Sequence, residues 1–186
     1  MIALGIIDVQ NDFMNPDGAL YVPGAEKIKN NIKKSISEAN LKNIPIFFTA
    51  DNHDGTEPEM SANGGIFPFH CIQNTRGQEN IEEAFVKEAV IFDKKCYNVF
   101  DSTYGNEFIR DWLKTYDIKE VVLIGVVGNI CVEAAALGLI EEGIKVTVVN
   151  NSVVWMHIDE KNNEKVSRKK LTDKGVNFVY TISEVI

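Results

Sequence analysis

Several features that mark particular protein classes are scarce in this sequence. It has only three cysteines, an odd number without a CxxC pair, which excludes a framework of paired disulfides and predicts at least one free thiol. No run of basic residues occurs and the net charge is −8, so neither a nucleic acid nor an anionic membrane is an expected partner. The apolar run 2–7 stops at Asp8, too short for a signal peptide or a membrane span. We expect a cytoplasmic protein.

What is present is typical of a globular α/β domain. Hydrophobic residues make up 45% and charged residues 25%, and 186 residues fit one domain. Six apolar runs, most of them continuous and β-branched, are expected to form strands: 2–7, 44–50, 89–92, 120–127, 144–149 and 176–180. Four helical patterns lie between them: 24–41, 105–116 (with Ser102 or Thr103 as N-cap), 129–142 and 159–174. This alternation predicts a three-layer αβα sandwich with a six-stranded, mainly parallel sheet.

Residues 51–78 break this alternation. The segment is rich in Gly, Pro, Asn and Asp and has no periodicity, and a loop of this length inside a compact domain is usually functional. It contains Asp51, His53 and His70, together with Glu57 or Glu59 as a further ligand. Two histidines with carboxylates suit Zn²⁺, Fe²⁺ or Mn²⁺. We therefore expect a metal-binding loop at 51–78.

Reactive side chains follow three of the expected strands. Asp8 ends the first, Lys94 and Lys95 end the third, and Cys131 begins the helix after the fourth. Ligands of open parallel sheets bind at this edge. A helix N-terminus and a nearby lysine are expected to lower the pKa of a thiol, and an aspartate can accept its proton. The alternative is a buried structural thiol and a capping aspartate.

The other cysteines and the third histidine have weaker claims. Cys71 directly follows His70, but burial is a better explanation for it than metal binding. Cys96 is interpreted as structural, and His157 as a surface or partly packed residue.

Four motifs occur in the order found in a known family. The opening IIDVQNDF resembles the D-x-Q-x-D-F start of the isochorismatase-like cysteine hydrolases. KKCYNVF resembles their K-x-x-Y-S-x-F element, and GVVGNICV resembles their G-x-x-x-x-x-C-V nucleophile turn. The loop pattern D-x-H…E-P-E…F-P-x-H-C resembles the nicotinamidase branch. The resemblance covers residues 2 to about 150 and implies the isochorismatase-like hydrolase fold, as one domain over 1–186.

The resemblance also implies roles for individual residues near the nucleophile. Asp8, Lys94 and Cys131 match the catalytic triad, and Lys94 is chosen over Lys95 because it stands three residues before a tyrosine. The family places a cis peptide bond before the nucleophile, here 126–127. The N–H groups of Val127 and Cys131 would then form the oxyanion hole.

Metal ligands and substrate contacts follow from the same comparison of motifs. Asp51, His53 and His70 match by position, and Glu59 is selected over Glu57 because it directly follows a proline. One divalent ion is implied, with Zn²⁺ preferred and Fe²⁺ or Mn²⁺ left open. The aromatic walls of the substrate site are expected from three phenylalanines: Phe13, Phe67 and Phe100.

The activity implied is hydrolysis of nicotinamide to nicotinate and ammonia through a thioester. A relative acting on a carbamoyl compound or another small amide is the alternative enzyme, and a binding module with relic residues is the non-enzymatic one. The expected partner is a small-molecule amide, and a homo-oligomer is left open. Four positions depart from the family pattern: Gly128 for threonine, Asn98 for serine, Phe67 for tryptophan and Phe69 for proline.

Overall fold

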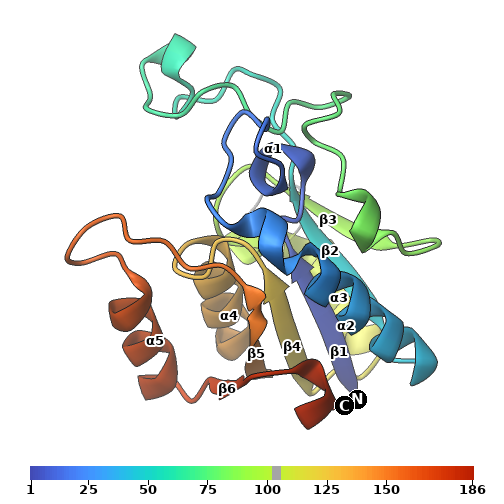
Figure 1. Cartoon of the computed structure of the whole chain (residues 1–186). Helices are drawn as coiled ribbons and strands as arrows, with labels where there is room; N and C mark the ends of the chain where they lie inside the picture. Colours follow the sequence, from blue (N-terminus) through green and yellow to red (C-terminus); the bar gives the residue numbers. More distant parts are fainter. Residues whose placement is uncertain (102–105) are drawn as a thin grey trace.

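The computed structural model describes residues 1–101 and 106–186, so the expected N-cap at Ser102 or Thr103 lies outside the described residues. Six strands form one sheet: β1 (Ile2–Ile7), β2 (Ile46–Asp51), β3 (Val90–Lys94), β4 (Glu120–Gly125), β5 (Lys145–Val153) and β6 (Asn177–Val179). Their order is β3-β2-β1-β4-β5-β6, and every pairing is parallel (Figure 1). The six apolar runs are thus confirmed as strands.

Of the described α-helices, four lie within the expected segments, although the last begins at Glu164 rather than at 159, and the short helix Asn11–Met14 was not foreseen. The α-helices are α1 (Asn11–Met14), α2 (Lys29–Leu41), α3 (Asn106–Thr115), α4 (Cys131–Glu141) and α5 (Glu164–Asp173). The 3₁₀ turns are η1 (Ala25–Ile28), η2 (Ser61–Asn63), η3 (Glu82–Ala84), η4 (Val99–Asp101) and η5 (Ile182–Glu184). β4 stops at Gly125, two residues earlier than expected, because the φ of 121° at this glycine ends the extended run.

The sheet lies between two apolar layers, which confirms the three-layer fold. Leu4 and Ile6 of β1 belong to the cluster that includes α2, whereas Ala3 and Ile7 belong to the cluster that includes α3, α4 and α5. Side chains alternate between the two faces of a strand, so a strand covered on both faces must be apolar throughout. This explains why the sequence shows continuous apolar runs.

The strand order positions the site. It reverses between β1 and β4, the two central strands, and in open α/β sheets the binding crevice lies outside the carboxyl ends at such a point. The segment 51–78, which we expected to bind a metal, leaves the end of β2 and projects from this edge beside α1 (Figure 1). None of the described helices has both the length and the apolar character needed to cross a membrane.

Candidate active site

Three side chains from separate elements meet at the carboxyl edge of the sheet, and we call them the reactive cluster: Asp8, Lys94 and Cys131. Lys94 Nζ lies 2.8 Å from Asp8 Oδ2 and 3.7 Å from Cys131 Sγ. Asp8 and Lys94 are each 1% exposed and Cys131 is 8% exposed. The end of β1, the end of β3 and the first residue of α4 therefore place a carboxylate, an ammonium and a thiol in contact, away from water.

Two further contacts of this cluster were not foreseen from the sequence. Lys94 Nζ also donates a hydrogen bond to Asp51 Oδ1, and Thr49 Oγ1 donates to Asp8 Oδ1 at 2.6 Å. Thr49 is a polar residue inside a buried strand, two residues before Asp51, and side chains two apart share one face of a strand. Its position in the strand is the sequence signal that could have identified Thr49 as a contact of the cluster.

Burial is the largest single influence on the pKa of each group in the cluster, but it sets the direction of the shift only for Asp8 and Cys131. It raises the pKa of Asp8, although Lys94 acts in the opposite direction. It also raises the pKa of Cys131 well above its ordinary value, and this outweighs the lowering by Lys94. For Lys94 burial lowers the pKa, but Asp51 and Asp8 hold it well above its usual range. The net direction for the thiol pKa is therefore opposite to the expected lowering, although the contribution of Lys94 has the expected direction.

A second cluster, the three-ligand cluster, consists of Asp51, His53 and His70. One ligand atom of each residue lies within 4.8 Å of the others, and all three residues are buried. His70 Nδ1 is 2.8 Å from Pro68 O, and because a carbonyl only accepts, Nδ1 is the donor of this bond and Nε2 is the ring atom that could bind a metal. Asp51 Oδ2 is 3.9 Å from His53 Nε2. These donors fit a divalent metal ion.

The structure does not bring the predicted fourth ligand into this cluster. Glu59 Oε1 lies 3.9 Å from His53 Nδ1, and the side chain is 33% exposed. Glu57 instead accepts the backbone N–H groups of Asp54 at 3.0 Å and Gly55 at 2.9 Å, so it shapes the loop. Metal binding by Glu59 stays a prediction.

Two residues of the opening motif hold the loop against the sheet. The Gln10 side chain donates to the backbone carbonyl of Asp51 at 2.7 Å and accepts from the Asp51 N–H at 2.8 Å. Asp12 Oδ2 accepts the N–H of Cys71 at 2.7 Å, next to His70. Both ends of the three-ligand cluster are thus fixed by the segment that follows β1.

The three predicted aromatic residues lie in different places. The ring of Phe13 is 5.7 Å and that of Phe67 is 6.0 Å from the ring of His70, centre to centre. Phe100 instead packs against Gly138, where an added Cβ would lie 2.4 Å from its ring. Gly138 is about two helical turns beyond the start of α4. The contacts of Phe100 therefore give no support to a role in substrate binding.

The β4–α4 turn, residues 126–130, carries the N–H groups expected to form an oxyanion hole. The peptide bond between Val126 and Val127 is cis, as expected. In the described part of the chain, the N–H groups of Val127 and Cys131 donate to no other group. They are available to a ligand at the mouth of the reactive cluster.

The remaining assignments are mixed. Cys71 is fully buried, as expected. Cys96, which we expected to be structural, is exposed, because it lies just past the end of β3, and its Sγ is 3.2 Å from Asn98 O. His157 lies on the surface, in agreement with its interpretation.

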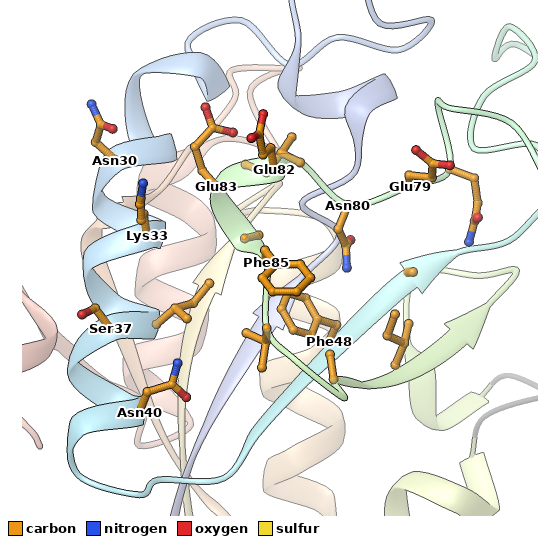
Figure 2. Close-up of a pocket in the computed structure, with 18 of the residues that line it drawn as sticks. Asn30, Lys33, Ser37, Asn40, Phe48, Glu79, Asn80, Glu82, Glu83 and Phe85 are labelled. Carbon is orange, nitrogen blue, oxygen red and sulfur yellow. The ribbon is translucent and has the colours of Figure 1, made fainter.

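An open groove of about 1410 Å³ lies away from both clusters, between α2 and η3 (Figure 2). The buried Phe48 and the exposed Phe85 line it, together with Lys33, Glu82 and Glu83. No residue of the reactive cluster or of the three-ligand cluster lines it.

Comparisons with known proteins agree on the fold. The model of the isochorismatase domain matches residues 3–173. Nicotinamidase of Saccharomyces cerevisiae is 26% identical over 185 residues, which covers 80% of this chain and 86% of that protein. Pyrazinamidase of Pyrococcus horikoshii, solved in complex with zinc, superposes with a TM-score of 0.85 and 30% identity over 96% of this chain and 98% of that one. N-carbamoylsarcosine amidase from Thermoplasma acidophilum gives a TM-score of 0.79 and 25% identity, over 100% and 98%.

Proposed function

The chain belongs to the isochorismatase family, and from that premise we propose that it is a metal-dependent cysteine amidohydrolase that converts nicotinamide and water to nicotinate and ammonia. The observation that carries the proposal is the buried ammonium of Lys94. It contacts Asp8, lies 3.7 Å from Cys131 Sγ and contacts Asp51 of the three-ligand cluster. We further propose that the enzyme acts in the cytoplasm, in the salvage of NAD.

In the proposed mechanism Cys131 is the nucleophile. Asp8 takes the thiol proton as the sulfur attacks the amide carbon. The N–H groups of Val127 and Cys131 donate to the oxyanion of the tetrahedral intermediate. Asp8 then returns the proton to the leaving nitrogen, ammonia departs and a thioester remains. Asp8 next removes a proton from water, which attacks the thioester, releases nicotinate and restores the thiol.

Lys94 and the loop residues prepare this chemistry. Lys94 keeps Asp8 oriented by its 2.8 Å contact and does not itself exchange a proton, since its pKa lies well above its usual range. Asp51, His53 and His70 would hold the metal ion. When bound, the ion would act as a Lewis acid for the pyridine nitrogen of the substrate. Phe13 and Phe67 would flank the ring.

Substrate choice gives one test of the proposal. Benzamide has the ring shape and the carboxamide of nicotinamide but lacks the ring nitrogen. We expect kcat/KM for nicotinamide to exceed that for benzamide by about 100-fold or more, since a site built to bind a polar atom rejects an analogue that lacks it. Ammonia release from both amides by the metal-loaded protein measures the ratio. Equal rates would contradict metal-assisted positioning of the ring.

Metal content tests the ligand assignment separately. Protein purified without chelator should carry about one divalent ion per chain, and His53→Ala should lose most of it because a ligand of the buried cluster is removed. Elemental analysis of both proteins measures the change. Glu59→Gln is the matched variant: loss of metal there supports Glu59 as a fourth ligand, whereas full occupancy limits the set to three residues. Full occupancy in His53→Ala would reject the assignment altogether.

A second candidate is hydrolysis of a carbamoyl compound or another small amide by the same reactive cluster. The likeness to N-carbamoylsarcosine amidase, at 25% identity over the whole chain, favours it. Ammonia release from N-carbamoylsarcosine, measured beside that from nicotinamide, separates the two. A higher kcat/KM for the carbamoyl compound would replace nicotinamide as the assigned substrate.

A further inference from the structure

The β4–α4 turn is held in place from outside its own helix. Ile130, the N-cap residue of α4, makes no side-chain capping hydrogen bond. The Val126 N–H donates to a backbone carbonyl of β1 at 3.0 Å, which fixes the start of the turn. The middle of the turn, Gly128 and Asn129, contacts residues 154–162, the segment that follows β5. We call this segment the clamp.

Hydrogen bonds join the turn to the clamp at three points. The Gly128 N–H donates to Val154 O at 2.7 Å. Asn129 Oδ1 accepts the Met156 N–H at 2.9 Å, and Asn129 Nδ2 donates to Asn162 Oδ1 at 2.5 Å. Asn129 is only 5% exposed, so both ends of its carboxamide are used inside the protein. One side chain thus ties the turn to both ends of the clamp.

An indole ring covers the same turn. A Cβ added to Gly128 would lie 2.4 Å from Cδ2 of Trp155, so only glycine leaves room for the ring. Here this chain departs from the threonine of the family pattern. The guanidinium carbon of Arg168 lies 4.5 Å from the ring centre of Trp155, and Arg168 is held by Glu164 and by Asn150, each at 2.7 Å. Trp155 is therefore fixed from the side of α5 and packs on the backbone of the turn.

We propose that Asn129 and Trp155 are positioning residues for the oxyanion hole. This inference rests on the proposed function and adds residues that do not contact the reacting atoms. Donors to an oxyanion act when they are aimed at the place where charge develops, and a displacement of about 1 Å can lower the rate about 100-fold. Because the charge is absent from the bound amide, a displaced turn lowers kcat and leaves KM nearly unchanged.

Four variants test the proposal. Asn129→Ala and Trp155→Ala should each lower kcat about 10- to 100-fold, with KM within about threefold of its original value. Trp155→Phe keeps an aromatic ring over Gly128 and should recover most of the rate. Thr181→Ala is the control, since Thr181 caps η5 through its hydroxyl group, 3.1 Å from Glu184, and has no hydrogen bond to the turn or to the clamp. It should lower the melting temperature and leave kcat unchanged.

Binding of an aldehyde gives a readout that does not depend on which amide is cleaved. The thiol adds to pyridine-3-carboxaldehyde: the sulfur–carbon bond forms, the carbonyl π bond breaks and Asp8 takes the thiol proton, so the oxygen carries a negative charge. The oxygen of this hemithioacetal takes the place of the oxyanion. The affinity of the adduct should fall in Asn129→Ala and Trp155→Ala by about the factor by which kcat falls, and should not change in Thr181→Ala.

The outcomes separate the two proposals. Unchanged kcat and unchanged adduct affinity in both alanine variants would overturn the positioning role. Equal losses of kcat in Thr181→Ala, at the same melting temperature, would overturn it as well. If the unsubstituted protein releases no ammonia from nicotinamide while the adduct affinities follow the expected pattern, the proposed substrate fails and the positioning role stands.

Discussion

Replacement of Cys131 by alanine should reduce ammonia release by about 10⁴-fold or more, because no thioester can form without the sulfur. Cys131 begins α4 close to Lys94 and Asp8, and it is not one of the residues of the three-ligand cluster. The metal content should therefore stay unchanged. Loss of one buried sulfur should shift the melting temperature by only about 2–4 °C.

The measurements for this variant are ammonia release, elemental analysis and thermal unfolding on the same preparation. Cys96→Ser is the matched control, because this exposed thiol lies outside the reactive cluster and its loss should leave most of the activity. A rate above about 1% of the original in Cys131→Ala would reject the thioester mechanism, because removal of a nucleophile causes a far larger loss.

Replacement of Lys94 by methionine should affect both activity and stability. Lys94 is 1% exposed and contacts Asp8 and Asp51, which are 1% and 7% exposed. Removing the ammonium leaves two buried carboxylates without their counter-charge, a change that typically costs about 3–5 kcal/mol. We expect the free energy of unfolding at neutral pH to fall by about that amount, and kcat/KM to fall about 10³-fold or more as Asp8 loses its orientation.

Lys95→Met is the control for this prediction, and it also tests the choice between adjacent lysines. Lys95 contacts Asp54 and Glu57 on the loop, and its side chain is 26% exposed. These ion pairs are partly exposed, so their loss should cost less than the loss of the fully buried ammonium, and this variant should be more stable than Lys94→Met. Urea unfolding and ammonia release measure both variants. Equal losses in the two would show that the buried ammonium has no special role.

The sequence predicted the sheet and the meeting of the reactive groups because both depend on local patterns. Continuous apolar runs identify strands covered on both faces, and the carboxyl ends of parallel strands share one edge. Asp8, Lys94 and Cys131 could therefore be assigned to one place before any coordinates were known. Metal ligands spaced along a loop, such as Asp51 and His53, were accessible in the same way.

Properties that depend on depth and on the third dimension could not be predicted. The hydrogen bond from Lys94 to Asp51 joins the ends of β3 and β2, and the spacing of the two residues in the sequence does not show that these ends lie side by side. The direction of the Cys131 pKa depends on whether burial or the nearby ammonium is stronger, and burial is stronger here. The packing of Phe100 against Gly138 likewise depends on the path of η4 over α4.

The placement of the two clusters on the sheet has an evolutionary consequence. Asp8 and Cys131 follow the two innermost strands, whereas most of the donors expected to select the ligand lie on the segment inserted between β2 and the edge strand β3. Insertions and exchanges in that segment disturb few core contacts, because loops tolerate change better than the strands they connect. The reactive cluster can thus be inherited unchanged while the segment 51–78 changes in sequence. Related proteins could acquire a different amide specificity in this way.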